Sequence, residues 1–187
     1  MSVRQEENRK KLFDDIIALA EKKLPKEQAA LLEEFTRHYY ASVALDDLAF
    51  RHISDLFGAI VSHWEIIYQR EPGQTHLRIY NPELEKDGWQ STHTIIEIAH
   101  DDMPFLVDSI QNELNRRGIT THIIFHAGGV KVKRDAEHKI VQVFPMGSNK
   151  KDCLSEAPIF IEIDRQTDPV VIEDLKKSIM HILHDVE

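Results

Sequence analysis

The sequence predicts an α+β fold in which an N-terminal helical segment precedes an antiparallel-rich sheet with two helices. Two observations support this prediction. Apolar residues recur at helical spacing up to about residue 70, and beyond it the period shifts towards the alternation of strands. The stretch "REPGQ", residues 70–74, separates the two halves and contains the usual helix-breaking residues. We therefore expect a helical segment at residues 1–70 and an α+β domain at residues 71–187.

The first half contains three amphipathic segments. Residues 8–24 and 26–40 place apolar side chains on one face of a helix. A third helix is expected over residues 48–69, capped by Asp46 or Asp47. Three helices of this kind indicate either a small bundle or a helical layer that covers another element.

The second half alternates between strand and helix patterns. A strand is expected at 75–82, and a more apolar one at 91–100. A helix that ends at Gly118 follows, and then a strand with a bend at Gly128–Gly129. The remaining elements are a hairpin strand at 140–147, a loop at 148–157, a strand at 158–164 and a helix from residue 168.

This order contains a β–α–β–β–α core, which is most of a ferredoxin-like βαββαβ unit. The last strand of that unit is absent, because the chain stops at Glu187. We expect the additional strand at residues 77–80 to occupy the vacant edge and to pair with residues 92–100.

Composition excludes several partners. The net charge of −9 disfavours binding to nucleic acid or to an anionic membrane surface. No apolar run approaches the roughly 20 residues that a membrane span needs, and the charged N-terminus lacks the apolar region of a signal peptide. The one cysteine, Cys153, cannot form an internal disulfide, so a cytoplasmic location is expected. Its neighbours in the sequence do not suggest a nucleophile.

Ionisable residues gather where the second strand meets the first helix of this unit, in "IIEIAHDDMPFLVDSIQNELNRRG", residues 95–118. One interpretation is that Asp101 or Asp102 caps the helix. The other is that the junction binds a ligand through Asp101, Asp102, Met103 and Asp108. Asp108 lies off the apolar stripe of the helix, so it is either solvated or available to the ammonium group of an amino acid or to a partner chain.

Neither a metal site nor a catalytic centre is expected. Four histidines, His93, His100, His122 and His126, lie on predicted strands, and the last two are four residues apart on what should be one face. Zinc sites usually combine histidine with closely spaced cysteine or carboxylate ligands, and that spacing is missing here. The sequence also lacks a GxGxxG loop and any readable Ser–His–Asp or Cys–His order, so no cofactor is expected in this chain.

Several stretches resemble a known family. They are "YNPELEKDGWQSTHT" (80–94), "HDDMPFLVDS" (100–109) and "ELNRRG" (113–118), and also "LDDLAFRHISDLFG" (45–58) and "IFIEIDR" (159–165). Together they resemble the N-terminal region of the large bacterial NAD-specific glutamate dehydrogenases, and the likeness covers nearly all of the chain.

This resemblance implies a function. The complete enzyme would be several times longer, would use NAD to convert glutamate to 2-oxoglutarate and ammonia, and would carry its catalytic domain far downstream. Its N-terminal region contains ACT-like modules of the βαββαβ type, which bind amino acids in other proteins. The chain would then be the first such module, truncated before its last strand. The resemblance implies a non-catalytic regulatory or assembly module whose partners are downstream domains, further subunits of a homo-oligomer and an amino-acid effector. A structural scaffold without a ligand is the alternative, and an independent enzyme is a third interpretation.

Overall fold

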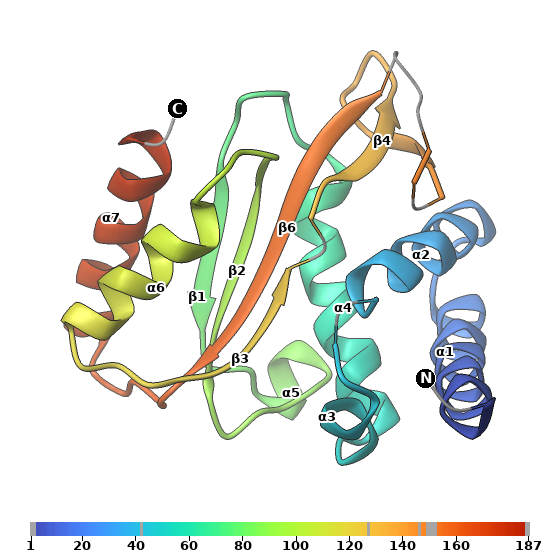
Figure 1. The fold of residues 1–187 in the computed structure, drawn as a ribbon, viewed down its shortest axis with the longest axis horizontal. Coiled ribbons are helices and arrows are strands. Elements are labelled where there is room, and N and C mark those ends of the chain that lie inside the picture. Colours follow the sequence, from blue (N-terminus) through green and yellow to red (C-terminus); the bar gives the residue numbers. More distant parts are fainter. Residues whose placement is uncertain (1–2, 42, 127, 146, 149–152, 186–187) are drawn as a thin grey trace.

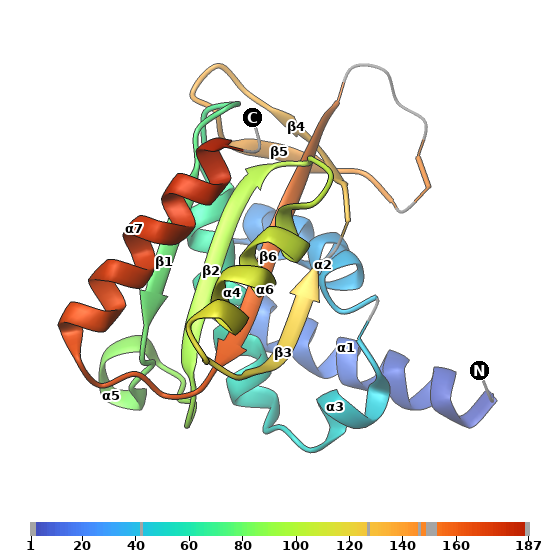
Figure 2. The same ribbon diagram turned by 60° about the vertical axis from the view of Figure 1, so that its left-hand side comes forward.

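An antiparallel sheet lies between two groups of helices (Figure 1). The computed structural model describes residues 3–41, 43–126, 128–145, 147–148 and 153–185. On one side of the sheet lie α1 (Val3–Lys23), α2 (Lys26–Tyr39), α3 (Leu45–Ala49) and α4 (Ile53–Tyr68). On the other side lie α6 (Leu106–Arg116) and α7 (Pro169–Asp185), and Figure 2 shows these two helices in front of the strands. No helix in these described ranges is long and apolar enough to cross a membrane.

The sheet confirms the predicted α+β class and its antiparallel pairing. Its strands are β1 (His76–Tyr80), β2 (Thr94–Asp101), β3 (Thr121–His126), β4 (Val130–Arg134), β5 (Ile140–Val143) and β6 (Leu154–Ile163). They are ordered β1-β2-β6-β4-β5, and β3 also pairs with β6. The short helix α5 (Leu84–Asp87) lies between β1 and β2 along the chain. As expected, β1 occupies the edge beside β2, and their antiparallel register runs from His76↔Ala99 to Tyr80↔Ile95.

The strand β6 is longer than predicted and contains Pro158. It begins at Leu154, inside the expected loop. Its first residues pair with β4 up to Glu156, and its later residues pair with β3 from Ile159. Pro158 therefore lies between the two partner strands, where its missing N–H removes no ladder bond on that side. The expected bend at Gly128–Gly129 is the break between β3 and β4 that makes this arrangement possible.

The prediction of a single third helix is wrong. It is divided into α3 and α4 by residues 50–52, and neither Asp46 nor Asp47 makes a capping hydrogen bond. The break allows Arg51 to reach the sheet, where its guanidinium donates to both carboxylate oxygens of Glu162 at 2.5 and 2.8 Å. Apolar spacing on both sides of the break is helical, so the sequence pattern alone does not reveal it.

Alternating residues of β2 and β6 build two different cores. The isoleucines Ile96, Ile98, Ile159 and Ile161 face α6 and α7 and pack against Leu114 and other aliphatic residues. The opposite face joins a cluster rich in aromatic rings, which continues into the helical segment. Its members include Phe35, Tyr39, Trp64, Phe125 and Phe160. Sheet and helical segment thus share one hydrophobic core.

The side of the sheet that faces α1–α4 also carries three buried glutamates, and each of them is paired with an arginine. Arg78 binds Glu97 at 2.7 Å, and Arg51 binds Glu162. Glu156 accepts two hydrogen bonds from Arg134, both at 2.8 Å. Burial raises the pKa of Glu97, and the adjacent Arg78 opposes this shift. Because each of these carboxylates has a guanidinium partner, the buried charges between the sheet and the helical segment are compensated.

A buried histidine connects the helical layer to β2. The Tyr39 hydroxyl and His63 Nδ1 are 2.7 Å apart, and His63 Nε2 lies 2.9 Å from the carbonyl oxygen of Ile98. A neutral imidazole that accepts from the tyrosine and donates to the carbonyl satisfies both contacts. Burial lowers the pKa of His63 to about 3, so it stays neutral in the folded chain down to strongly acidic pH.

Because His63 is buried and neutral, we expect the folded chain to lose stability at acidic pH. Below about pH 6.5 the unfolded chain protonates His63 and the folded chain does not, so each pH unit down to about 3 should remove about 1.4 kcal/mol of stability. Chemical denaturation between pH 7 and pH 5 measures the slope, which should be flatter in His63→Gln. The exposed His181 provides a control, since His181→Gln should keep the wild-type slope. Equal slopes in wild type and His63→Gln would contradict the assignment.

Candidate functional site

Three of the four residues proposed for ligand binding line one groove at the β2–α6 junction. The groove has a volume of about 500 Å³ and is lined by Asp102, Met103, Pro104, Phe105, Leu106, Val107, Asp108 and His126. Its lining combines apolar side chains with two carboxylates, Asp102 and Asp108, and one imidazole, His126. The fourth proposed residue, Asp101, is not among the lining residues.

Asp101 faces the helical layer and is already paired. Its Oδ1 accepts from Arg70 at 2.6 Å, and its Oδ2 accepts from the backbone N–H of Gly73 at 2.9 Å. The buried Arg70 also contacts Glu156 at 3.1 Å. Asp101 therefore anchors the end of β2 to the loop after α4, and it is not available to a ligand in the groove.

The capping interpretation of Asp101 and Asp102 is wrong. No side chain caps α6, and the residue before the helix is Phe105. Asp102 instead turns towards β6, where its Oδ2 accepts from Ser155 Oγ at 3.2 Å and its N–H donates to the Ser155 carbonyl at 2.9 Å. The two aspartates thus leave the N-terminal N–H groups of α6 without a side-chain acceptor.

Glycine at position 129 allows β4 to approach Asp102. The backbone of Gly129 has φ +66°, and a Cβ there would lie 2.8 Å from Asp102 Oδ2 and 3.1 Å from Ser155 Oγ. The left-handed conformation favours glycine, and any larger residue would also displace the Asp102 side chain. The sequence showed a bend at this place, but not that the bend forms the wall behind Asp102.

Phe105 is strained and exposed. Its φ of +67° lies in the left-handed region, which is rare for a residue with a bulky side chain. Its ring is nevertheless 72% exposed on the rim of the groove. Strained backbone of this kind concentrates at sites of binding, and an exposed aromatic ring offers apolar contact area to a ligand or partner.

Asp108 lies in the first turn of α6. Its side chain is exposed, and it lies where a negative charge interacts favourably with the helix dipole. Asp108 lines the groove from α6, and Asp102 lines it from the residue after β2.

We expect Asp108→Asn to lower the free energy of unfolding by less than about 1 kcal/mol, because only the dipole contribution of an exposed carboxylate is lost. Urea denaturation of the two proteins measures the difference. Asn112→Ala on the exposed face of α6 is the control and should change stability by a similarly small amount. A loss above about 2 kcal/mol for Asp108→Asn would show that the carboxylate has a structural partner.

His126 enters the groove from β3, and the sequence had not connected it with the junction. It pairs in register with Ile159 on β6. Burial lowers the pKa of His126, and the nearby Asp102 carboxylate opposes this shift. In the sequence, His126 is only a polar residue at the end of an apolar strand. Its proximity to Asp102 depends on how the strands pair.

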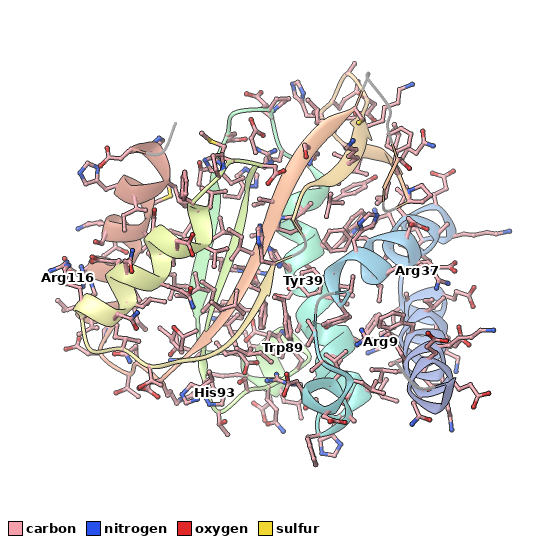
Figure 3. All side chains as sticks on the ribbon, viewed as in Figure 1. Arg9, Arg37, Tyr39, Trp89, His93 and Arg116 are labelled. Carbon is pink, nitrogen blue, oxygen red and sulfur yellow. The ribbon has the colours of Figure 1, made fainter. Side chains whose placement is uncertain are left out.

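A second polar cluster lies at the opposite end of β3, near Trp89 and His93 in Figure 3. The rings of His93 and His122 are 4.2 Å apart, and His122 Nε2 lies 2.7 Å from Asp164 Oδ1. His93 Nδ1 lies 3.5 Å from Glu162, which is already held by Arg51. Among the described residues, no group of three or more histidine, cysteine or carboxylate side chains is arranged to hold a metal ion.

The prediction that His122 and His126 share one face is wrong. The register between β3 and β6 shifts between Thr121 and Ile123, so the alternation of side chains is interrupted at His122. As a result His122 lines the groove beside His93, and His126 lines the junction groove.

The strand order and the helix-covered sheet define an ACT-like α+β module with a groove at its first strand-to-helix junction. The family model of the glutamate dehydrogenase ACT1 domain matches residues 35–179. The chain therefore belongs to this family, the N-terminal region of NAD-specific glutamate dehydrogenases. The match begins within α2, so it includes the end of α2, α3 and α4 as well as the sheet, and the domain boundary at residue 70 stays a prediction.

Two curated relatives are similar along most of the chain. The NAD-specific glutamate dehydrogenase of Halomonas elongata is 41% identical over 186 residues, which are 100% of this chain and 12% of the relative. The enzyme of the same name from Pseudomonas aeruginosa is 39% identical over 152 residues, which are 81% of this chain and 9% of the relative. The chain thus spans about a tenth of the length of these relatives.

Proposed function

We propose that the chain is a non-catalytic regulatory or assembly module of an NAD-dependent glutamate dehydrogenase. That enzyme converts glutamate and NAD to 2-oxoglutarate, ammonia and NADH. The observation that supports this most strongly is the match of residues 35–179 to the ACT1 domain of glutamate dehydrogenases. In this proposal the NAD site lies in other parts of the enzyme, and the module's partners are downstream domains and further subunits of a cytoplasmic homo-oligomer.

The junction groove is the proposed site of an amino-acid effector. The uncapped N–H groups at the start of α6 are suited to the carboxylate of such a ligand. Asp102 and Asp108 lie on either side of the groove and are suited to its ammonium group. Met103 and Phe105 supply apolar surface for its side chain. Asp101 is left out of this site, because Arg70 and Gly73 already occupy its carboxylate.

A scaffold without a ligand is the second candidate. The exposure of the Phe105 ring favours it, since an apolar ring on the rim of an open groove also suits contact with another domain. The scaffold does not need a strand from another domain to fill the edge beside β2, because β1 already occupies that edge.

Two activity measurements test the proposed module. The purified chain should produce no NADH from glutamate and NAD. In a full-length glutamate dehydrogenase that contains this sequence, Asp102→Asn and Asp108→Asn should change effector response or assembly and leave the KM for NAD unchanged. NADH production by the chain alone would contradict a non-catalytic role, and variants with unaltered regulation and assembly would contradict a recognition role for the groove.

A further inference from the structure

A second cleft, away from the junction, is enclosed by the end of α1, by α4, by β1 and by α5. Its volume is about 310 Å³, the size of a small-molecule site. Its charged lining residues are Lys23, Arg78, Lys86, Glu65 and Asp87. We propose that this cleft binds a small anion with at least two negative charges, supplied by carboxylate or phosphate groups.

Arg78 is the fixed cation of the cleft. Its Nε donates to Glu97 at 2.8 Å, and its Nη2 donates to both the carbonyl and the hydroxyl oxygen of Ser62 at 2.5 Å. These contacts hold one side of the guanidinium against buried groups. Its Nη1 lies 3.9 Å from Glu65, too far for a hydrogen bond. Arg78 thus lines the cleft with a guanidinium whose ion pair to Glu65 there is long.

Two lysines add positive charge from other segments. Lys23, in the last turn of α1, places its ammonium 5.4 Å from the ring centre of Phe57, and this cation–π contact keeps it at the edge of the cleft. Lys86 lies on α5. Cations thus outnumber carboxylates in the lining, although acidic residues predominate in the chain as a whole. A multivalent anion is the ligand class that neutralises cations converging from three segments.

The two carboxylates in the lining leave room for such a ligand. Asp87 Oδ2 accepts the backbone N–H of Glu83 at 2.8 Å, so this carboxylate is already used at the start of α5. Glu65 is 66% exposed and its ion pair with Arg78 is long, at 3.9 Å, so it can turn towards solvent when an anion arrives. It follows that Glu65 competes with the anion and that its neutralisation should strengthen binding.

Isothermal titration calorimetry of the whole chain tests this proposal, with inorganic phosphate and succinate as probes at matched low ionic strength. Lys86→Gln and Lys23→Gln should each weaken binding by about 3- to 10-fold, because each removes one converging charge. Glu65→Gln should strengthen binding by about 3-fold, because it removes the competing carboxylate. Lys177→Gln is the matched control, since Lys177 is an exposed lysine of α7 outside the cleft.

The direction of these changes decides the outcome. Opposite effects of the lysine and Glu65 variants, with no effect of Lys177→Gln, support the cleft. Binding of phosphate alone or of succinate alone also supports it and identifies the chemical group that fits. Absence of binding by both probes overturns the proposal, and so does equal weakening by Lys86→Gln and Lys177→Gln, which would indicate a nonspecific charge effect. No residue of the junction groove lines this cleft, so failure here leaves the proposed function untouched.

Discussion

Replacing Glu156 by glutamine is expected to lower the free energy of unfolding by about 3–5 kcal/mol. The Glu156 side chain is buried and binds Arg134 through two hydrogen bonds and Arg70 through a third contact. Both arginines are themselves buried. Without the carboxylate, Arg70 would keep the partly exposed Asp101 as an anionic partner, whereas the remaining described contacts of Arg134 are to neutral backbone carbonyls. An uncompensated buried charge is strongly destabilising.

Urea denaturation at pH 7 measures this loss. The exposed pair Glu173–Lys177 on α7 supplies the control, and Glu173→Gln should change stability by less than about 1 kcal/mol. A value below about 1 kcal/mol for Glu156→Gln would mean that water or Asp101 compensates the arginines, and the buried network would then not be a main stabilising element.

Leu114→Ala is expected to destabilise the chain by about 2–5 kcal/mol, because it opens a cavity in the aliphatic core between α6 and the sheet. Leu114 is fully buried and packs with isoleucines of β2 and β6. Its neighbour Asn115 is exposed, so Asn115→Ala should cost less than about 1 kcal/mol. Thermal unfolding of both variants measures the contrast, and similar midpoints would show that the assigned faces of α6 are wrong.

The periodic parts of the fold could be predicted from the sequence. Short apolar stretches identified β2, β3 and β6, and helical spacing identified α1, α2, α6 and α7. The pairing of β1 with β2 was expected from the sequence, and the register confirms it. The features that could not be predicted depend on contacts between distant residues. Arg51 divides a helical pattern because it binds Glu162, and Pro158 is tolerated within β6 because β3 and β4 separate beside it.

Contacts between distant residues also decide which part of the candidate site could be predicted. Chain proximity placed Asp102, Met103 and Asp108 together, and the structure brings them into one groove. Asp101 is adjacent in sequence to Asp102 but points to the other side, since successive residues of a strand alternate. The partners that give the groove its walls are distant in sequence, and only the register of β3, β4 and β6 brings them near. They are His126, which lines the groove, and Gly129 and Ser155, which lie against Asp102.

The central claim, that the junction groove recognises an amino-acid effector, is tested most directly by thermal-shift measurements on the chain. The twenty amino acids, 2-oxoglutarate and NAD are the ligands to compare. We predict that at least one amino acid stabilises the folded chain, by about 2.7 kcal/mol at 100 times its dissociation constant. We further predict that Asp102→Asn and Asp108→Asn abolish this stabilisation, and that NAD gives none. No stabilisation by any amino acid, or stabilisation unaffected by both variants, would contradict the claim.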